Sequence, residues 1–170
     1  MLEVAALRDR LSAHVDVFAA LVAGVDDTQA RWKPDPAQWS ILEVVNHLAD
    51  EEVEDFRARL DATLHHPGSW PPIDPQGWPA SRGYNDRKLG QSLARFLEAR
   101  ASSLAWLDGL VDPDWSLAYQ HPSIGPISAG DLLTSWVAHD HIHIRQINRL
   151  HRDWLVASLS GHSPRYAGRW

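Results

Sequence analysis

The sequence predicts a single all-α domain over residues 1–170, built as a four-helix bundle with long crossover loops. Three observations support this fold class. Apolar side chains recur at spacings of three and four over four separate segments. Two of these segments begin with a capping-box motif, and no segment shows a convincing strand-like alternation. A chain of 170 residues is also long enough to bury one sizeable core.

The first helix is expected over residues 2–24. Its apolar stripe consists of Val4, Leu7, Leu11, Val15, Phe18 and Val22. Gly24 follows where a C-cap is expected. Residues 25–39 include Pro34 and Pro36, so we expect a connector in which no helix persists.

The second helix is expected over residues 40–66. Ser40 and Glu43 form a capping box in which each side chain satisfies a backbone N–H at the start of the helix. The apolar stripe of this helix consists of Ile41, Val45, Leu48, Phe56 and Leu60. Residues 67–85 then hold five prolines, three glycines and two tryptophans. This segment is too long to be a passive link between neighbouring helices.

The third and fourth helices are expected over residues 86–110 and 128–151. The intervening stretch, residues 111–127, has three prolines and is expected to be a loop. Ser128 and Asp131 form the second capping box, which marks the start of the fourth helix. The tail, residues 152–170, has room for one more helical turn before Gly161.

Composition excludes several classes of function. The net charge is −6 and no Lys/Arg cluster occurs, which argues against a nucleic-acid partner or an anionic membrane partner. No apolar run is long enough to span a membrane, and the first residues lack the features of a signal peptide. The chain has no cysteine, which excludes disulfides and thiolate ligands. We therefore expect a cytoplasmic protein.

Histidine supplies the main functional signal, since ten are present in a chain without cysteine. The densest group is His139, His141 and His143. In a strand all three would share one face, whereas in a helix only His139 and His143 do. The capping box and the apolar neighbours favour the helix, which places these two imidazoles in the middle of the apolar arc. Two buried imidazoles one turn apart are typical of a metal site.

A third ligand is needed because catalytic metal sites usually use three protein groups and keep one position open. The candidates are His14, His47, His65, His66, His121, His151 and His162. His65, His66 and His162 are expected in solvent because they stand at a helix end or in the tail. His47 lies two turns into the second helix, at the edge of its apolar stripe, and is the best placed.

The segment Trp32–Leu48, WKPDPAQWSILEVVNHL, followed by His139-x-x-x-His143-x-x-Gln146, resembles the DinB/YfiT-like family of metalloenzymes. The resemblance implies a four-helix bundle whose metal site consists of His47, His139 and His143. It also implies zinc, nickel or a similar divalent ion, and frequently a homodimer. Members often carry an acidic residue five positions after the first histidine, which here is Glu52. Glu52 also falls on the apolar stripe, where we expect it to support the metal ligands.

The resemblance further implies a reaction, because some members transfer a small thiol such as bacillithiol, mycothiol or glutathione. We therefore expect a metal-dependent thiol transferase with a small-molecule substrate. A metal-dependent hydrolase, with Glu51, Glu52 or Asp140 as proton acceptor, is the alternative within catalysis. A non-catalytic metal-binding module is the third hypothesis. Trp70 and Trp78 in the long connector are expected to form the roof of the pocket.

Overall fold

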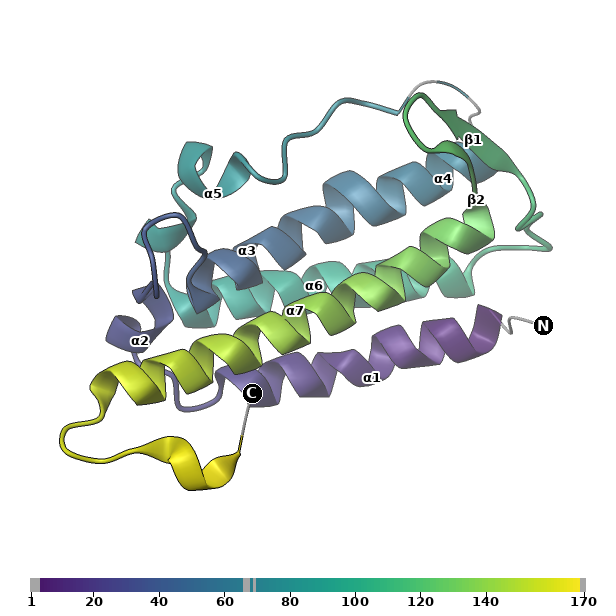
Figure 1. Ribbon diagram of the computed structural model, residues 1–170. Coiled ribbons are helices and arrows are strands. Elements are labelled where there is room, and N and C mark those ends of the chain that lie inside the picture. The colour runs from purple at the N-terminus through teal and green to yellow at the C-terminus, as the bar shows by residue number, and fades with distance from the viewer. Residues whose placement is uncertain (1–3, 66–67, 69, 169–170) are drawn as a thin grey trace.

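Four long helical rods make up the bundle in the computed structural model, which describes residues 4–65, 68 and 70–168 (Figure 1). These rods are α1 (Val4–Val22), α3 (Ile41–Glu51) continued through η1 (Glu52–Phe56) into α4 (Arg57–His65), α6 (Leu89–Asp108) and α7 (Ala129–Ser158). The shorter elements of the described chain are α2 (Asp27–Arg31), α5 (Trp78–Ser81), η2 (Tyr84–Asp86), β1 (Ala118–His121), β2 (Gly125–Ser128) and η3 (Pro164–Ala167). The predicted four-helix bundle is confirmed.

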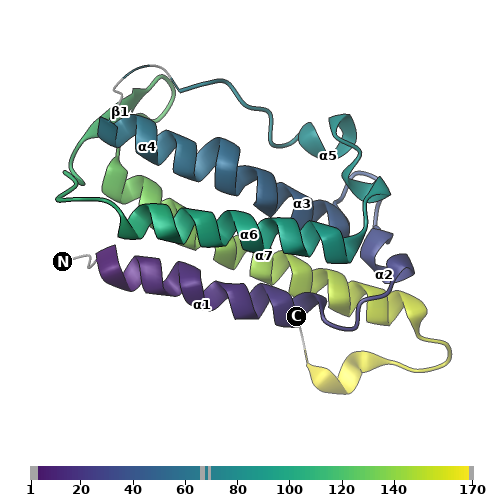
Figure 2. The same cartoon turned by 180° about the vertical axis from the view of Figure 1, so that it is seen from behind.

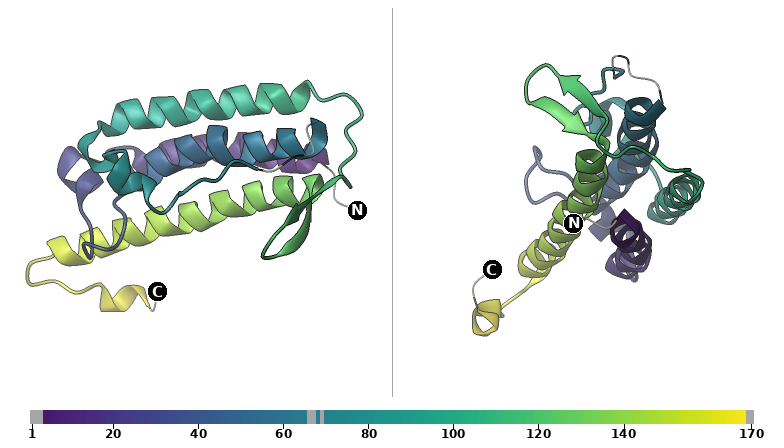
Figure 3. Two further views of the ribbon diagram at one scale, coloured as in Figure 1. Left: turned by 90° about the horizontal axis from the view of Figure 1, so that it is seen from above. Right: turned by 90° about the vertical axis from the view of Figure 1, so that its right-hand side faces the viewer.

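The order of the helices includes one crossover (Figures 1 and 2). The connector after α4 returns along the outside of the bundle, so that α6 runs parallel to α3–α4. The later connector, which holds β1 and β2, joins neighbouring ends of α6 and α7 at one end of the bundle (Figure 3). α3 packs against α6, and α1 packs against α7. No helix of the described segments is long and apolar enough to cross a membrane.

Both predicted capping boxes are present. The Ser40 N–H donates to Glu43 Oε2 at 2.8 Å, and the Glu43 N–H donates to Ser40 Oγ at 3.1 Å. Ser128 and Asp131 make the same reciprocal pair at the start of α7. The helix α7 continues to Ser158, past the predicted end at residue 151. Its last turns reach the first connector, where the ring centroids of Trp154 and of Trp32, the residue after α2, lie 5.5 Å apart.

The connectors contain more regular structure than predicted. The connector 25–39 was expected to hold no helix, yet α2 forms there because Asp26 caps it and the prolines come only after Arg31. The stretch 111–127 was expected to be a loop, yet β1 and β2 pair as an antiparallel hairpin. These strands have only four residues each, too few for a visible alternation. In the second rod, a π-helical turn, η1, separates α3 from α4.

The core is divided by a layer of buried polar side chains. One apolar cluster lies around Phe18 and a second around Trp136. Of the buried polar and charged side chains that stand between members of the two clusters, one from each rod joins a single hydrogen-bonded group. This polar layer consists of His14, Glu52, Arg100 and Asp140. It lies at the level of Glu51 and His139, which are neighbours of its members in sequence.

Candidate metal centre

Three imidazoles from two helices converge at one side of the polar layer. His47 projects from α3, and His139 and His143 project from α7 one turn apart. The Nε2 atom of His139 lies 3.4 Å from that of His47 and 3.0 Å from that of His143. His47 and His143 are buried and His139 is half-buried. The structure thus brings together the three histidines that the sequence singled out.

The third histidine of the cluster in sequence, His141, lies apart from them. It is exposed, and its ring meets that of His14 at 4.7 Å on the side of α1. This arrangement confirms that the segment is helical and that His139 and His143 share a face which His141 does not.

The protonation of His143 is fixed by Gln146. Its Nδ1–H donates to Gln146 Oε1 at 2.7 Å, so its Nε2 keeps a free lone pair directed at the other two rings. The indole of Trp39 lies nearly parallel to the His143 ring, with centroids 6.3 Å apart, and 4.7 Å from the His47 ring. Trp39 therefore forms one wall of the site. Sequence reasoning quoted Trp39 in the family pattern but gave it no role.

The surroundings keep the imidazoles neutral. Burial lowers the pKa of His47 to about 2, and the neighbouring His143 and His139 rings add to this shift. Burial and the His143 ring lower the pKa of His139 to about 3, and burial also lowers the pKa of His143. Neutral imidazole is the form that binds a metal ion.

The donor set fits a divalent cation. Metal–nitrogen distances of about 2.0–2.1 Å place two ligands of a tetrahedral site roughly 3.3 Å apart. The Nε2 separations of 3.4 Å for His47–His139 and 3.0 Å for His139–His143 are close to this value. Three nitrogen lone pairs that face one another at such distances repel unless a proton or a cation lies among them. His47, His139 and His143 are thus arranged as metal ligands are.

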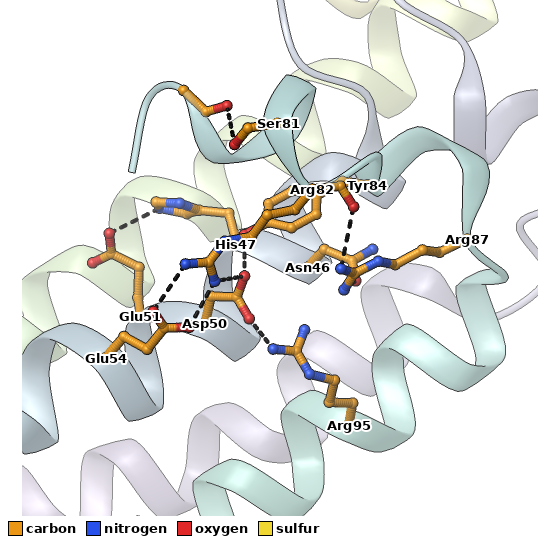
Figure 4. Close-up of polar contacts among 11 residues, drawn as sticks. Asn46, His47, Asp50, Glu51, Glu54, Ser81, Arg82, Tyr84, Arg87 and Arg95 are labelled. Carbon is orange, nitrogen blue, oxygen red and sulfur yellow. Dashed lines mark hydrogen bonds and ion pairs between the residues drawn. The ribbon is translucent and has the colours of Figure 1, made fainter. Parts of the chain in front are cut away.

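Glu51 is the carboxylate that faces the imidazoles. Its Oε1 lies 3.8 Å from His47 Nε2, and its Oε2 lies 3.8 Å from His139 Nε2 (Figure 4 shows the contact with His47). Burial raises the pKa of Glu51, and the Asp55 carboxylate raises it further. A basic carboxylate next to a metal site is suited to accept a proton.

Glu52 and Asp140 face away from the imidazoles and into the polar layer. Glu52 Oε1 accepts hydrogen bonds of 2.8 Å from Arg100 Nε and from the Trp136 indole N–H. Asp140 accepts two hydrogen bonds of 2.8 Å from Arg100 and lies 2.8 Å from His14 Nδ1. The carboxylate beside the candidate ligands is therefore Glu51 and not Glu52, because the partner of Glu52 is the buried guanidinium of α6.

The long connector is tied to α3 next to the site (Figure 4). Asp50 accepts hydrogen bonds from the Tyr84 hydroxyl, from Arg82 and from Arg95. Arg82 also donates to both oxygens of Glu54, at 2.6 and 2.9 Å. These contacts hold α5 and η2 on the outside of α3, and thereby help to bury the helix that carries His47.

A groove of about 1010 Å³ opens beside the histidines. It is lined by Trp39, by Pro75 and Gln76 of the long connector, and by residues of α7. The expected roof residues lie elsewhere. Trp78 packs under the guanidinium of Arg82, and Trp70 stacks on Tyr119 of the hairpin with centroids 4.0 Å apart. The connector thus contributes to the groove, but through Pro75 and Gln76.

The remaining candidate histidines that the structure describes do not reach the site. The Nε2 of His151 contacts the carbonyl of Leu21 at 2.6 Å, and its Nδ1 contacts Gln29. His65 pairs with Asp61 at the end of α4, and His121 accepts from the Ser123 N–H in the hairpin. His162 is exposed in the tail, whereas His66 lies outside the described residues.

The fold and the site together define a class: helical bundles in which a histidine triad forms a candidate metal centre on the inner faces of two helices. Residues 10–147 match the model of the DinB superfamily, and the chain belongs to this superfamily. A relative in Oceanobacillus iheyensis, named "Putative metal-dependent hydrolase", is 30% identical over 120 residues, which is 68% of each chain.

The protein YfiT of Bacillus subtilis, also named "Putative metal-dependent hydrolase", is 29% identical over 116 residues. This alignment covers 67% of the present chain and 65% of YfiT. A solved structure of YfiT superposes with a TM-score of 0.77 at 24% identity and covers 88% of this chain and 86% of that one. It is described as a probable metal-dependent hydrolase with an unusual four-helix bundle topology. At this identity the likeness concerns the fold alone.

Proposed function

We propose that this protein is a divalent-metal-dependent hydrolase of a small molecule, with His47, His139 and His143 as the metal ligands. The convergence of three neutral Nε2 atoms, with Glu51 beside two of them, is the observation that carries the proposal. The names of the relatives support the same reaction class. Zinc or nickel is the proposed ion, since imidazole ligands suit both.

Each residue of the proposed site has a separate role in hydrolysis. A cation held by three neutral imidazoles supplies Lewis acidity, which lowers the pKa of water and polarises a carbonyl group. Gln146 holds the His143 ring in the tautomer that presents Nε2. Glu51 accepts a proton from the attacking water and passes it to the leaving group. Trp39 shields the histidine side of the groove from bulk water.

The test is hydrolysis by protein loaded with Zn²⁺ or Ni²⁺, measured on a panel of esters and amides without any thiol. We expect metal-dependent turnover that Glu51→Gln lowers about 10²–10⁴-fold while the metal is retained. Glu98→Gln, an exposed carboxylate on α6, is the matched control and should have no effect.

Two outcomes would contradict the hydrolase proposal. Turnover only in the presence of bacillithiol, mycothiol or glutathione would instead support the thiol transferase that the family resemblance implies. Metal binding without turnover in either assay would support a non-catalytic module. The homodimer and the cytoplasmic location expected from the sequence stay predictions.

A further inference from the structure

The groove beside the histidines carries an excess of positive charge. Its charged lining residues are Glu51, Arg145, Arg149, Arg152 and Asp153. Three guanidinium groups thus face two carboxylates, although the whole chain has a net charge of −6. A bound divalent cation would increase this local excess. A concave positive region on an acidic protein concentrates anionic small molecules.

The arginines retain donors for a ligand. Arg149 and Arg152 both contact the single carboxylate of Asp153, at 3.4 and 2.8 Å. Arg145 makes no hydrogen bond or ion pair with any residue that the structure describes. All three arginines are exposed on α7. Their planar forks are therefore open to bind the paired oxygens of a carboxylate or a phosphate.

The spacing along α7 sets the size of the ligand. Arg145 and Arg149 are one helical turn apart and so share a face. Arg149 stands six positions after His143, which corresponds to roughly 9 Å along the helix axis. A molecule whose reacting group lies at the histidines can thus place an anion among the arginines. Trp39, Pro75 and Gln76 also line the groove, and none of them carries a charge.

We propose that the substrate carries an anionic group, carboxylate or phosphate, which binds to Arg145 and Arg149, about 3 and 9 Å beyond His143 along the axis of α7. This inference rests on the proposed hydrolase function and names the class of substrate for it. Arg152, paired more closely with Asp153, contributes to the positive field.

The test separates the metal site from the anion site by using ligands that occupy both. Suberic monohydroxamate presents a metal-chelating hydroxamate at one end and a carboxylate at the other, and its methyl ester lacks the charge. The dissociation constants are measured by calorimetric titration of Zn²⁺-loaded protein at low salt. We expect the acid to bind at least about tenfold more tightly than the ester, which corresponds to about 1.4 kcal/mol. A phosphonate in place of the carboxylate tells which anion the arginines prefer.

Substitutions of single arginines test which residues cause the tighter binding of the acid. Arg149→Gln and Arg145→Gln should each reduce the ratio between acid and ester without weakening the ester. Arg10→Gln, which removes the same charge from an exposed position on α1, should leave the ratio unchanged. Equal binding of acid and ester to the wild type would overturn the anion site and leave the metal site standing. Failure of both ligands to bind would overturn the open metal position, and with it both proposals.

Discussion

Replacing Arg100 with Met removes the cation at the centre of the polar layer. The Arg100 side chain is fully buried and donates to Glu52 Oε1, to both oxygens of Asp140 and to the carbonyl of Leu11, at 2.8–3.0 Å. Met would leave two buried carboxylates without their counter-ion. Breaking a buried ion pair by removing one partner costs about 3–5 kcal/mol. This is a large share of the roughly 5–15 kcal/mol that stabilises a typical domain.

The assay is urea unfolding of the metal-free protein at pH 7, followed by circular dichroism. Arg10→Met is the matched control and should change the free energy of unfolding by less than about 0.5 kcal/mol. Adding Glu52→Gln and Asp140→Asn to Arg100→Met should recover part of the loss, because no unpaired charge then remains buried. A loss below about 1 kcal/mol for Arg100→Met alone would contradict a dry, ion-paired layer, since it would mean that water reaches the two carboxylates.

Three further predictions concern the site and its helices. Burial lowers the pKa of His47 to about 2 from its ordinary value of 6.5, so between these values the unfolded chain binds a proton there and the native one does not. Falling pH thus destabilises the metal-free wild type through this group. His47→Gln should therefore gain about 1 kcal/mol relative to the wild type between pH 6.5 and 5.5 in urea unfolding, and a constant difference would contradict this. Gln146→Leu should weaken metal binding about 10–100-fold in competition with a chelator, and unchanged affinity would count against the role of its amide. Ser40→Ala should lower the free energy of unfolding by about 1 kcal/mol in the same urea assay, since it removes the cap of α3; no change would mean that water replaces it.

Local patterns in the sequence were enough to place the helices and two of the candidate ligands. The capping boxes marked the starts of α3 and α7, and the helical period put His139 and His143 on one face. The position of His47 at the edge of the apolar stripe of its helix made it only the best of seven candidates for the third ligand. The family resemblance supplied its pairing with His139 and His143. This difference has a physical cause, because contacts within one helix follow from spacing whereas contacts between helices depend on packing.

The contacts of Glu51 and Glu52 also depend on packing between helices, which spacing along the sequence does not give. The period correctly placed Glu52 on the buried stripe, but its partner Arg100 stands 48 positions away on another helix. The sequence therefore did not tell whether Glu52 or Glu51 faces the metal ligands. The lining of the groove depends likewise on the crossover, which brings Pro75 and Gln76 to the groove and carries Trp70 and Trp78 to other contacts.

We propose that His47, His139 and His143 together hold one divalent ion. The most direct test of this proposal is the metal content of purified protein, measured by mass spectrometry after incubation with Zn²⁺ and removal of the excess. We expect one ion per chain for the wild type and for His141→Ala, whose imidazole is exposed on the other side of α7. We expect loss of the ion in His139→Ala. Loss in His141→Ala together with retention in His139→Ala would contradict this assignment of the metal ligands.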